Sequence, residues 1–268
     1  MSTPSRIVML SVGIGDYAHP EVDDLALTRA DATDMARAVM QLGSADTLVR
    51  LMLDGQATKA GMKAGIDWLA AAVGADDVAL FYYSGHGARY TDQDSDEPDA
   101  YDEFLCPYDT GVGGGIETLI RDDEMREWLK AITAHTANLV VILDSCHSGS
   151  AILLGEATPK ELSRELVEKI LKGYKRPAKA AGIVQEGPLE GHMLLAAAEA
   201  HQSSYELHGM TNGLFTTYVL EGLADASIGT FYDLFDYAAD KVNADAAEYN
   251  LQQNPHRLDR VEGDLAYR

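Results

Sequence analysis

The chain has 268 residues, of which 46% are hydrophobic, and its formal net charge is -22. This apolar content is enough for a sizeable core and excludes a wholly disordered chain. A surface this acidic repels phosphate backbones and anionic lipid, so we expect neither nucleic-acid nor membrane binding. Two cysteines, no signal-peptide pattern and no apolar run of about 18 residues predict a cytoplasmic protein, not a disulfide scaffold or a membrane protein.

Apolar runs of strand length alternate with segments of helical period. The predicted strands are 7–14, 48–53, 78–83, 139–143 and 193–198, with a short final strand within 255–265. The predicted helices are 25–42, 58–73, 122–132, 213–223 and 230–249. Residues 89–115 are interpreted as an acidic loop, and the looser, basic stretch 150–191 has helical spacing between Leu162 and Leu171. Strands alternating with helices predict an α/β fold with a mainly parallel sheet.

Two short motifs stand where predicted strands end. Residues 83–87 read Tyr-Ser-Gly-His-Gly, and residues 144–149 read Asp-Ser-Cys-His-Ser-Gly. Parallel sheets place active sites at the carboxyl ends of their strands, so we expect His86 and Cys146 to lie close together. A thiol becomes a useful nucleophile when a neighbouring imidazole accepts its proton. The sequence therefore predicts a cysteine peptidase with Cys146 as nucleophile and His86 as general base.

Glycines beside these residues leave room for a peptide backbone. The backbone N–H groups of Gly87 and Cys146 are predicted to form an oxyanion hole. Cys106 has no nearby glycine-rich turn, so we interpret it as a core residue. His147 adjoins the nucleophile, but neighbours on an extended chain point to opposite faces, which makes it a poor base.

The two motifs resemble those of the metacaspases, in particular the bacterial caspase-like forms. The resemblance covers nearly the whole chain and includes residues 12–17, 30–32, 102–107, 120–124, 197–199 and 212–216. It implies a caspase-like, six-stranded, mainly parallel sheet flanked by helices. It also implies one peptidase domain over 1–268, with a larger part at 1–149, a linker at 150–191 and a smaller part at 192–268.

The resemblance implies cleavage of proteins after Arg or Lys at P1, the residue whose carbonyl is attacked. The sequence supports this, because Asp144 lies two residues before Cys146 and strand alternation points both side chains to the same side. A carboxylate there suits a cationic P1 side chain. By resemblance, Asp31 supplies a second carboxylate and Ser84 also lines this pocket.

Two alternatives stay open. Arg29 lies close to Asp31 in sequence and Arg89 follows His86, so either arginine could receive an acidic P1 side chain, as in a caspase-type protease. The other alternative is a catalytically silent scaffold that acts by binding, against which the intact cysteine and histidine count.

The resemblance also implies a possible calcium site. Many metacaspases bind calcium through acidic residues, and Asp102, Asp122 and Asp123 match three of those ligands. Residues 151–154, where the family has a further aspartate, read Ala-Ile-Leu-Leu and carry no carboxylate. Calcium is thus a candidate activator, whereas the chemistry itself requires no cofactor.

Self-cleavage is predicted between residues 155 and 187. Basic residues cluster there in an otherwise acidic chain, and proline and glycine indicate exposed chain. The preferred sites are Lys172, Lys175 and Lys179. An upstream activating protease is an alternative, and the resemblance implies a role in bacterial stress or antiviral defence.

Overall fold

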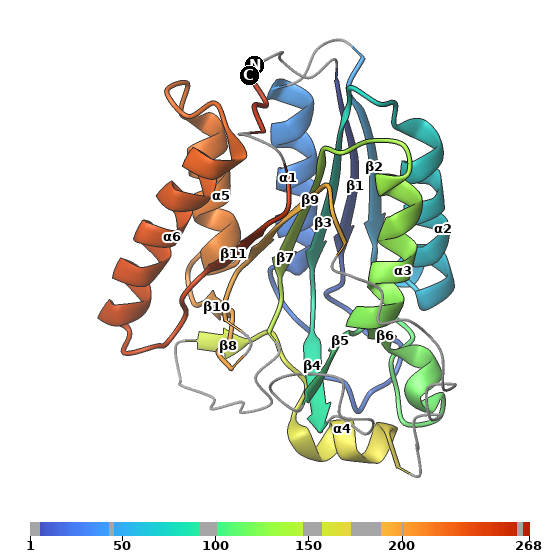
Figure 1. The fold of residues 1–268 in the computed structure, drawn as a ribbon. Coiled ribbons are helices and arrows are strands. Elements are labelled where there is room, and N and C mark those ends of the chain that lie inside the picture. Colours follow the sequence, from blue (N-terminus) through green and yellow to red (C-terminus); the bar gives the residue numbers. More distant parts are fainter. Residues whose placement is uncertain are drawn as a thin grey trace.

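The computed structural model describes residues 6–42, 46–91, 101–146, 157–172, 189–199, 201–261 and 265–268. Within these ranges, one six-stranded sheet has the order β11-β9-β7-β3-β1-β2 (Figure 1). Its strands are β1 (Ile7–Gly13), β2 (Leu48–Leu53), β3 (Val78–Ser84), β7 (Leu139–Asp144), β9 (His192–Ala196) and β11 (His256–Asp259). Only β11 in this sheet is antiparallel to its neighbour, so the predicted mainly parallel sheet is confirmed.

Helices cover both faces of this sheet. One face packs against α1 (Thr28–Leu42), α5 (Leu214–Ala224) and α6 (Phe231–Glu248), and the other against α2 (Lys59–Ala72) and α3 (Asp122–Thr133). In β1, Val8 and Leu10 join the core under α2 and α3, whereas Ile7 and Met9 join the core under α1, α5 and α6. Both faces are covered, which explains why β1 and β3 are buried along their whole length and read as continuous apolar runs. No described helix is both long and apolar enough to cross a membrane.

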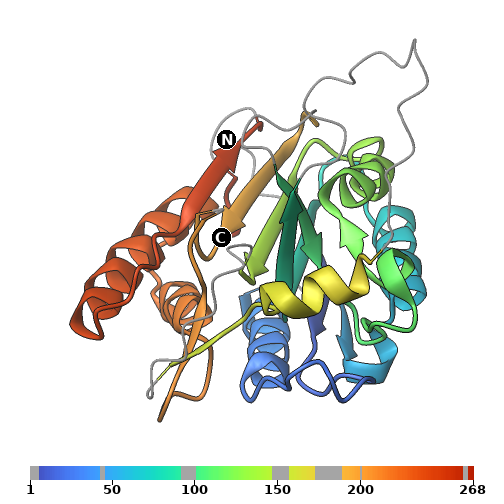
Figure 2. The same cartoon turned by 90° about the horizontal axis from the view of Figure 1, so that it is seen from below.

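Smaller elements lie beyond the carboxyl ends of the central strands. A three-stranded sheet contains β4 (Gly87–Thr91), β5 (Tyr101–Leu105) and β6 (Ile120–Arg121), and β8 (Ala157–Pro159) pairs with β10 (Tyr205–Leu207). The helix α4 (Arg164–Ile170) crosses this edge, which Figure 2 shows from below. Single 3-10 turns are η1 (Asp54–Gln56) and η2 (Gly115–Thr118).

The predicted loop over residues 89–115 is wrong in part, because it contains most of β4 and all of β5. These strands bury only some of their side chains, such as Ala88 and Phe104, so their short sequences are rich in polar residues and lack a strong apolar signal. The helical spacing between Leu162 and Leu171 is confirmed as α4. The predicted larger and smaller parts share one sheet through the pairing of β7 with β9, and their boundaries stay predictions.

A close approach between α1 and β1 prepares the site. A Cβ atom on Gly13 would lie 2.5 Å from the Thr28 carbonyl oxygen and 2.7 Å from the Ala32 Cβ. Glycine at the end of β1 therefore lets the first turn of α1 rest directly on the sheet. Asp31 lies in that turn, next to the carboxyl ends of the central strands.

The N-terminus of α2 gives a test of local stability. The Thr58 hydroxyl accepts a hydrogen bond from the Gly61 N–H at 3.0 Å. Since this bond satisfies a free helix N–H, Thr58→Ala should lower the free energy of unfolding by about 1 kcal/mol, measured by urea denaturation. Thr58→Ser retains the oxygen and is the control; an equal loss in both variants would contradict the capping role.

Candidate active site

The two sequence motifs meet at one edge of the sheet. Ser84 and Asp144 are the last residues of β3 and β7 and are direct neighbours in register. His86 and Cys146 each follow two residues later. Because the strands are parallel, β3 and β7 both end at the lower edge of the sheet in Figure 1, as the sequence predicted.

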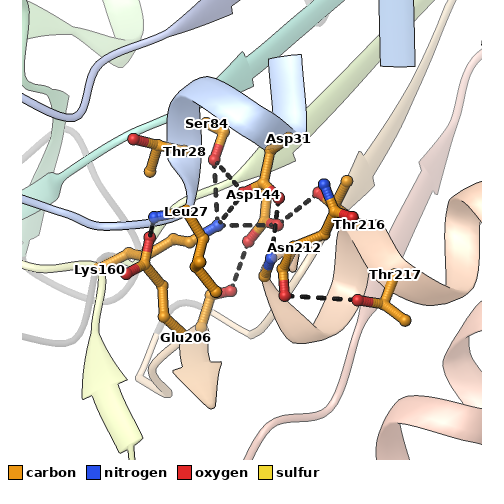
Figure 3. Close-up of polar contacts among 12 residues, drawn as sticks. Leu27, Thr28, Asp31, Ser84, Asp144, Lys160, Glu206, Asn212, Thr216 and Thr217 are labelled. Carbon is orange, nitrogen blue, oxygen red and sulfur yellow. Dashed lines mark hydrogen bonds and ion pairs between the residues drawn. The ribbon is translucent and has the colours of Figure 1, made fainter. Parts of the chain in front are cut away.

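A buried lysine lies between the predicted pocket carboxylates. The Lys160 ammonium lies 2.8 Å from Asp31 Oδ2 and 2.9 Å from Asp144 Oδ2. It also donates to the Ser84 hydroxyl at 3.0 Å, so its three N–H donors have three acceptors (Figure 3). We call Asp31, Ser84 and Asp144 the acidic pocket. All three residues and Lys160 itself are fully buried.

Other groups hold the two carboxylates in place. The Gly213 N–H donates to Asp31 Oδ1 at 2.8 Å. The hydroxyls of Ser204 and Thr216 donate to Asp144 at 2.6 Å each. A Cβ on Gly213 would lie 2.4 Å from the Lys160 Nζ, so glycine is required to leave room for the cation.

The charges in the pocket depend on one another. Burial alone would lower the pKa of Lys160, but the facing carboxylates of Asp144 and Asp31 raise it above its ordinary value, so the side chain stays cationic. Burial raises the pKa of Asp31, and the ammonium opposes that rise. A further carboxylate, Glu206 on β10, accepts the N–H groups of Leu27 and Ala26 at 2.8 and 2.9 Å, and burial raises its pKa.

The His86 ring is buried in a fixed orientation. Its Nε2 lies 2.7 Å from the Asp23 carbonyl oxygen, and its ring stacks at a tilt on Tyr17 with centroids 5.0 Å apart. A carbonyl only accepts hydrogen bonds, so Nε2 carries the proton in the neutral ring. The Nδ1 atom has no hydrogen-bond partner among the described residues and keeps its lone pair. Burial lowers the pKa of His86 to about 4, although the Asp23 and Lys160 carbonyls oppose this, so the ring is a neutral base at pH 7.

The Cys146 thiol is also fully buried. It donates to the Ser204 carbonyl at 2.9 Å and accepts the Ser204 N–H at 2.6 Å. Burial, together with the nearby Glu161 carboxylate, raises the pKa of this thiol well above its ordinary value. Both effects favour the neutral thiol over the thiolate.

The Lys160 backbone lies against the same two motifs. Its carbonyl oxygen accepts the Gly87 N–H at 3.0 Å and the Cys146 N–H at 3.2 Å. These are the two donors that the sequence predicted for an oxyanion hole, and they converge on one oxygen. The arrangement can polarise a peptide carbonyl next to a thiol and a neutral imidazole.

The two arginines considered as partners for an acidic P1 side chain make their contacts outside the acidic pocket. Arg29 pairs with Asp16 at 2.9 Å and is partly exposed. The Arg89 guanidinium stacks on Tyr101, 4.2 Å from the ring centroid. The pocket that lies against the strand ends therefore presents carboxylates.

The three candidate calcium ligands lie on β5 and at the start of α3. Asp102 is buried on β5, and Asp122 and Asp123 stand in the first turn of α3, where Asp123 pairs with Arg126. Within the described ranges, no three His, Cys, Asp or Glu side chains are grouped so that they could hold a metal ion. Calcium binding by these residues stays a prediction.

The other residues singled out from the sequence lie away from the acidic pocket or outside the described residues. Cys106 is a buried free thiol whose N–H donates to the His86 carbonyl, and burial raises its pKa. Lys172 is exposed just after α4, and Lys175 and Lys179 lie outside the described residues. Five further residues belong to this site without a prediction from the sequence: Lys160, Ser204, Glu206, Gly213 and Thr216. The only local signal for Lys160 was its place at the start of the basic linker.

The chain is similar in sequence to proteins of a known family. Residues 6–261 match the family model described as the caspase domain. Metacaspase-1 of Arabidopsis thaliana is 39% identical over 95 residues, and Metacaspase-1 of Emericella nidulans is 41% identical over 97. These alignments cover 35% and 36% of this chain but only 25% and 23% of the two relatives.

Solved structures share the fold at lower identity. A protein from Geobacter sulfurreducens superposes with a TM-score of 0.70 at 21% identity, over 97% of this chain and 95% of the other. Caspase-1 from Spodoptera frugiperda superposes with a TM-score of 0.64 at 14% identity, over 100% of this chain and 91% of the other.

The buried imidazole predicts a pH-dependent stability. Between pH 6.5 and about 4, the unfolded chain binds a proton at His86 that the folded chain does not, so the free energy of unfolding falls as pH falls. From pH 7 to 4.5, a Cys146→Ala chain should lose about 2–3 kcal/mol more than a Cys146→Ala, His86→Gln chain, at about 1.36 kcal/mol per pH unit. Urea denaturation measures both; parallel curves would contradict a buried neutral ring.

Proposed function

Because this chain belongs to the caspase-domain family of cysteine peptidases, we propose that it is an endopeptidase that cleaves proteins after Lys or Arg with Cys146 as nucleophile and His86 as base. One observation supports the proposed preference for Lys or Arg at P1. A lysine ammonium fits between Asp31 and Asp144 while the carbonyl of the same residue meets two N–H groups beside the thiol. An Arg or Lys side chain at P1 has the charge and length to take that position.

The residues have the following proposed roles. His86 Nδ1 takes the thiol proton, because Nε2 is held by the Asp23 carbonyl. Cys146 Sγ attacks the P1 carbonyl, and the N–H groups of Gly87 and Cys146 stabilise the developing oxyanion. The imidazolium then protonates the leaving amine, and a water molecule hydrolyses the thioester. No metal or other cofactor is needed for these steps.

Self-processing belongs to the same proposal. The linker at 150–191 carries basic residues, and the acidic pocket accepts a basic residue from that linker. Calcium activation remains a prediction from the sequence, with Asp102, Asp122 and Asp123 as its candidate ligands.

The first test concerns the nucleophile and the base. Cys146→Ala should abolish turnover of a fluorogenic peptide with Arg at P1. His86→Ala should lower kcat/KM by at least about 100-fold, because the thiol loses its proton acceptor. Cys106→Ala is the matched control and should retain activity, since that thiol lies in the core. Substantial turnover by Cys146→Ala would overturn the assignment.

The second test concerns the P1 residue. Peptides that differ only at P1 should be cleaved when P1 is Arg or Lys and not when it is Asp. Asp144→Asn should lower kcat/KM for the Arg peptide by about 30-fold or more, which corresponds to about 2 kcal/mol for a lost buried charge partner. Asp16→Asn, which alters a surface carboxylate, is the control.

Faster cleavage of the Asp peptide than of the Arg peptide would show that the pocket is wrongly assigned. The same peptides, measured with added calcium and with a chelator, test calcium activation. Equal rates in both conditions would remove calcium from the proposal.

A further inference from the structure

Two tyrosine hydroxyls hold the backbone of His86 at the point where the chain leaves the central sheet. Residues 85 and 86 lie between the end of β3 and the start of β4, so the polar groups of His86 need partners outside those strands. The His86 N–H donates to the Tyr17 hydroxyl at 2.8 Å. The Tyr83 hydroxyl donates to the His86 carbonyl, also at 2.8 Å. All three residues are buried, so both backbone groups of His86 are fixed by side chains inside the protein.

The glycine before His86 leaves the space that these hydroxyls occupy. A Cβ atom on Gly85 would lie 2.7 Å from the Tyr83 hydroxyl oxygen and 3.2 Å from the Tyr17 hydroxyl oxygen. A larger residue would therefore push the hydroxyls away from the His86 backbone. This glycine has a packing reason of its own, separate from the approach of a peptide.

The ring of Tyr17 also lies against the imidazole. The two ring centroids are 5.0 Å apart and the ring planes are tilted by 35°. This contact limits rotation of the imidazole, while the Asp23 carbonyl holds Nε2 at 2.7 Å. The face of a tyrosine ring attracts cations, so the same contact favours the imidazolium that forms when Nδ1 accepts a proton. Burial raises the pKa of Tyr17 well above its ordinary value, so the hydroxyl itself stays neutral.

The connection that carries Tyr17 and Asp23 is anchored near the sheet. It joins β1 to α1, and β1 ends beside β3 because the two strands are parallel. The Tyr17 N–H donates to Asp24 Oδ1 at 2.9 Å, and the Gly15 N–H donates to Asp54 Oδ1 at 2.9 Å. Asp54 has a φ of 43°, a left-handed conformation that costs free energy and persists where the surrounding structure fixes it. These contacts hold the tyrosine in a constant position relative to β3.

Packing alone would not require the hydroxyl of Tyr17. A phenylalanine ring fills the same space, and burying an added hydroxyl costs free energy unless it is hydrogen-bonded. Here the partner of the hydroxyl is the backbone N–H of the proposed base. In the described part of the chain, no hydrogen bond joins Tyr17 to Asp31 or Asp144 of the acidic pocket.

We propose that Tyr17 is a positioning residue for the base. Its hydroxyl fixes the backbone of His86 and its ring fixes the plane of the imidazole, so that Nε2 stays on the Asp23 carbonyl and Nδ1 stays free for the thiol proton. This inference rests on the proposed function and adds a residue that acts through His86 rather than on the substrate. Loss of Tyr17 contacts should therefore slow the chemical step and leave binding of the P1 side chain unchanged.

The kinetic test measures turnover of a fluorogenic peptide with Arg at P1. Tyr17→Phe keeps the ring and loses the hydroxyl, so it should lower kcat about tenfold and change KM by less than about twofold. Tyr17→Leu also loses the ring and should lower kcat about 100-fold. An irreversible peptidyl inhibitor with Arg at P1 counts the active sites, so that an unfolded fraction does not enter kcat.

The matched control is Tyr218→Phe. The Tyr218 hydroxyl is partly buried and donates to Asp245, which joins α5 to α6. This variant also removes one tyrosine hydroxyl and its hydrogen bond, but it should keep the wild-type kcat. Urea denaturation of both Phe variants gives their free energies of unfolding, so that similar losses of stability can be compared with different losses of kcat.

A second measurement does not depend on turnover. In protein labelled with 15N-histidine, the signal of the His86 ring is identified by its absence from His86→Gln. At pH 7 the wild-type ring should show the Nε2–H tautomer, with slow exchange of that hydrogen with water. The hydrogen should exchange faster in Tyr17→Phe and faster still in Tyr17→Leu, whereas Tyr218→Phe should match wild type.

The results separate this inference from the proposed function. Tyr17→Phe with wild-type kcat and unchanged Nε2–H exchange overturns the inference and leaves the proposed peptidase intact. An equal fall of kcat in Tyr218→Phe, or a change in KM alone, also overturns it, because the effect would then come from stability or from substrate binding. Wild type that cleaves no Arg peptide overturns the proposed function, and Nε2–H exchange in the Tyr17 variants then decides the positioning role by itself.

Discussion

The ammonium of Lys160 between Asp31 and Asp144 is the interaction on which the rest of the site depends. Two carboxylates buried this close together would repel each other strongly without a cation, because the surroundings screen them poorly. The cation joins α1, β3, β7 and the linker at one point. Burying an ammonium costs free energy, and here the cost is offset because each of its N–H donors has an acceptor. Removing one partner of a buried pair commonly costs about 3–5 kcal/mol.

The fold creates this charged site by ordinary sheet geometry. Parallel strands end at one edge, so Ser84 and Asp144 become neighbours without any special turn. The glycine at position 13 lets α1 approach closely enough for Asp31 to reach them, and Gly213 leaves space for the cation. Hydroxyl and N–H donors of the protein also hold the two carboxylates, which fixes their positions around the Lys160 ammonium.

Burial of the site keeps both the imidazole of His86 and the thiol of Cys146 uncharged. It lowers the pKa of His86 to about 4 and raises the pKa of the Cys146 thiol, so both groups are neutral at pH 7. A neutral imidazole with a free Nδ1 can accept a proton, but the thiol proton is directed to the Ser204 carbonyl. In this arrangement the thiol proton is hydrogen-bonded to the Ser204 carbonyl and the thiolate is not favoured.

Three features could be predicted from the sequence: the alternation of strands and helices, the parallel sheet, and the approach of His86 and Cys146 at its edge. These follow from patterns within short windows, since apolar runs and strand-end glycines are read locally. The group that fills the acidic pocket could not be predicted in this way, because it comes from a distant part of the chain. Lys160 contacts Asp31 across 129 positions of sequence, and no local pattern encodes such a pairing. The strands β8 and β10 escaped prediction for the same reason: each has three residues, and each is stabilised by the other rather than by its own sequence.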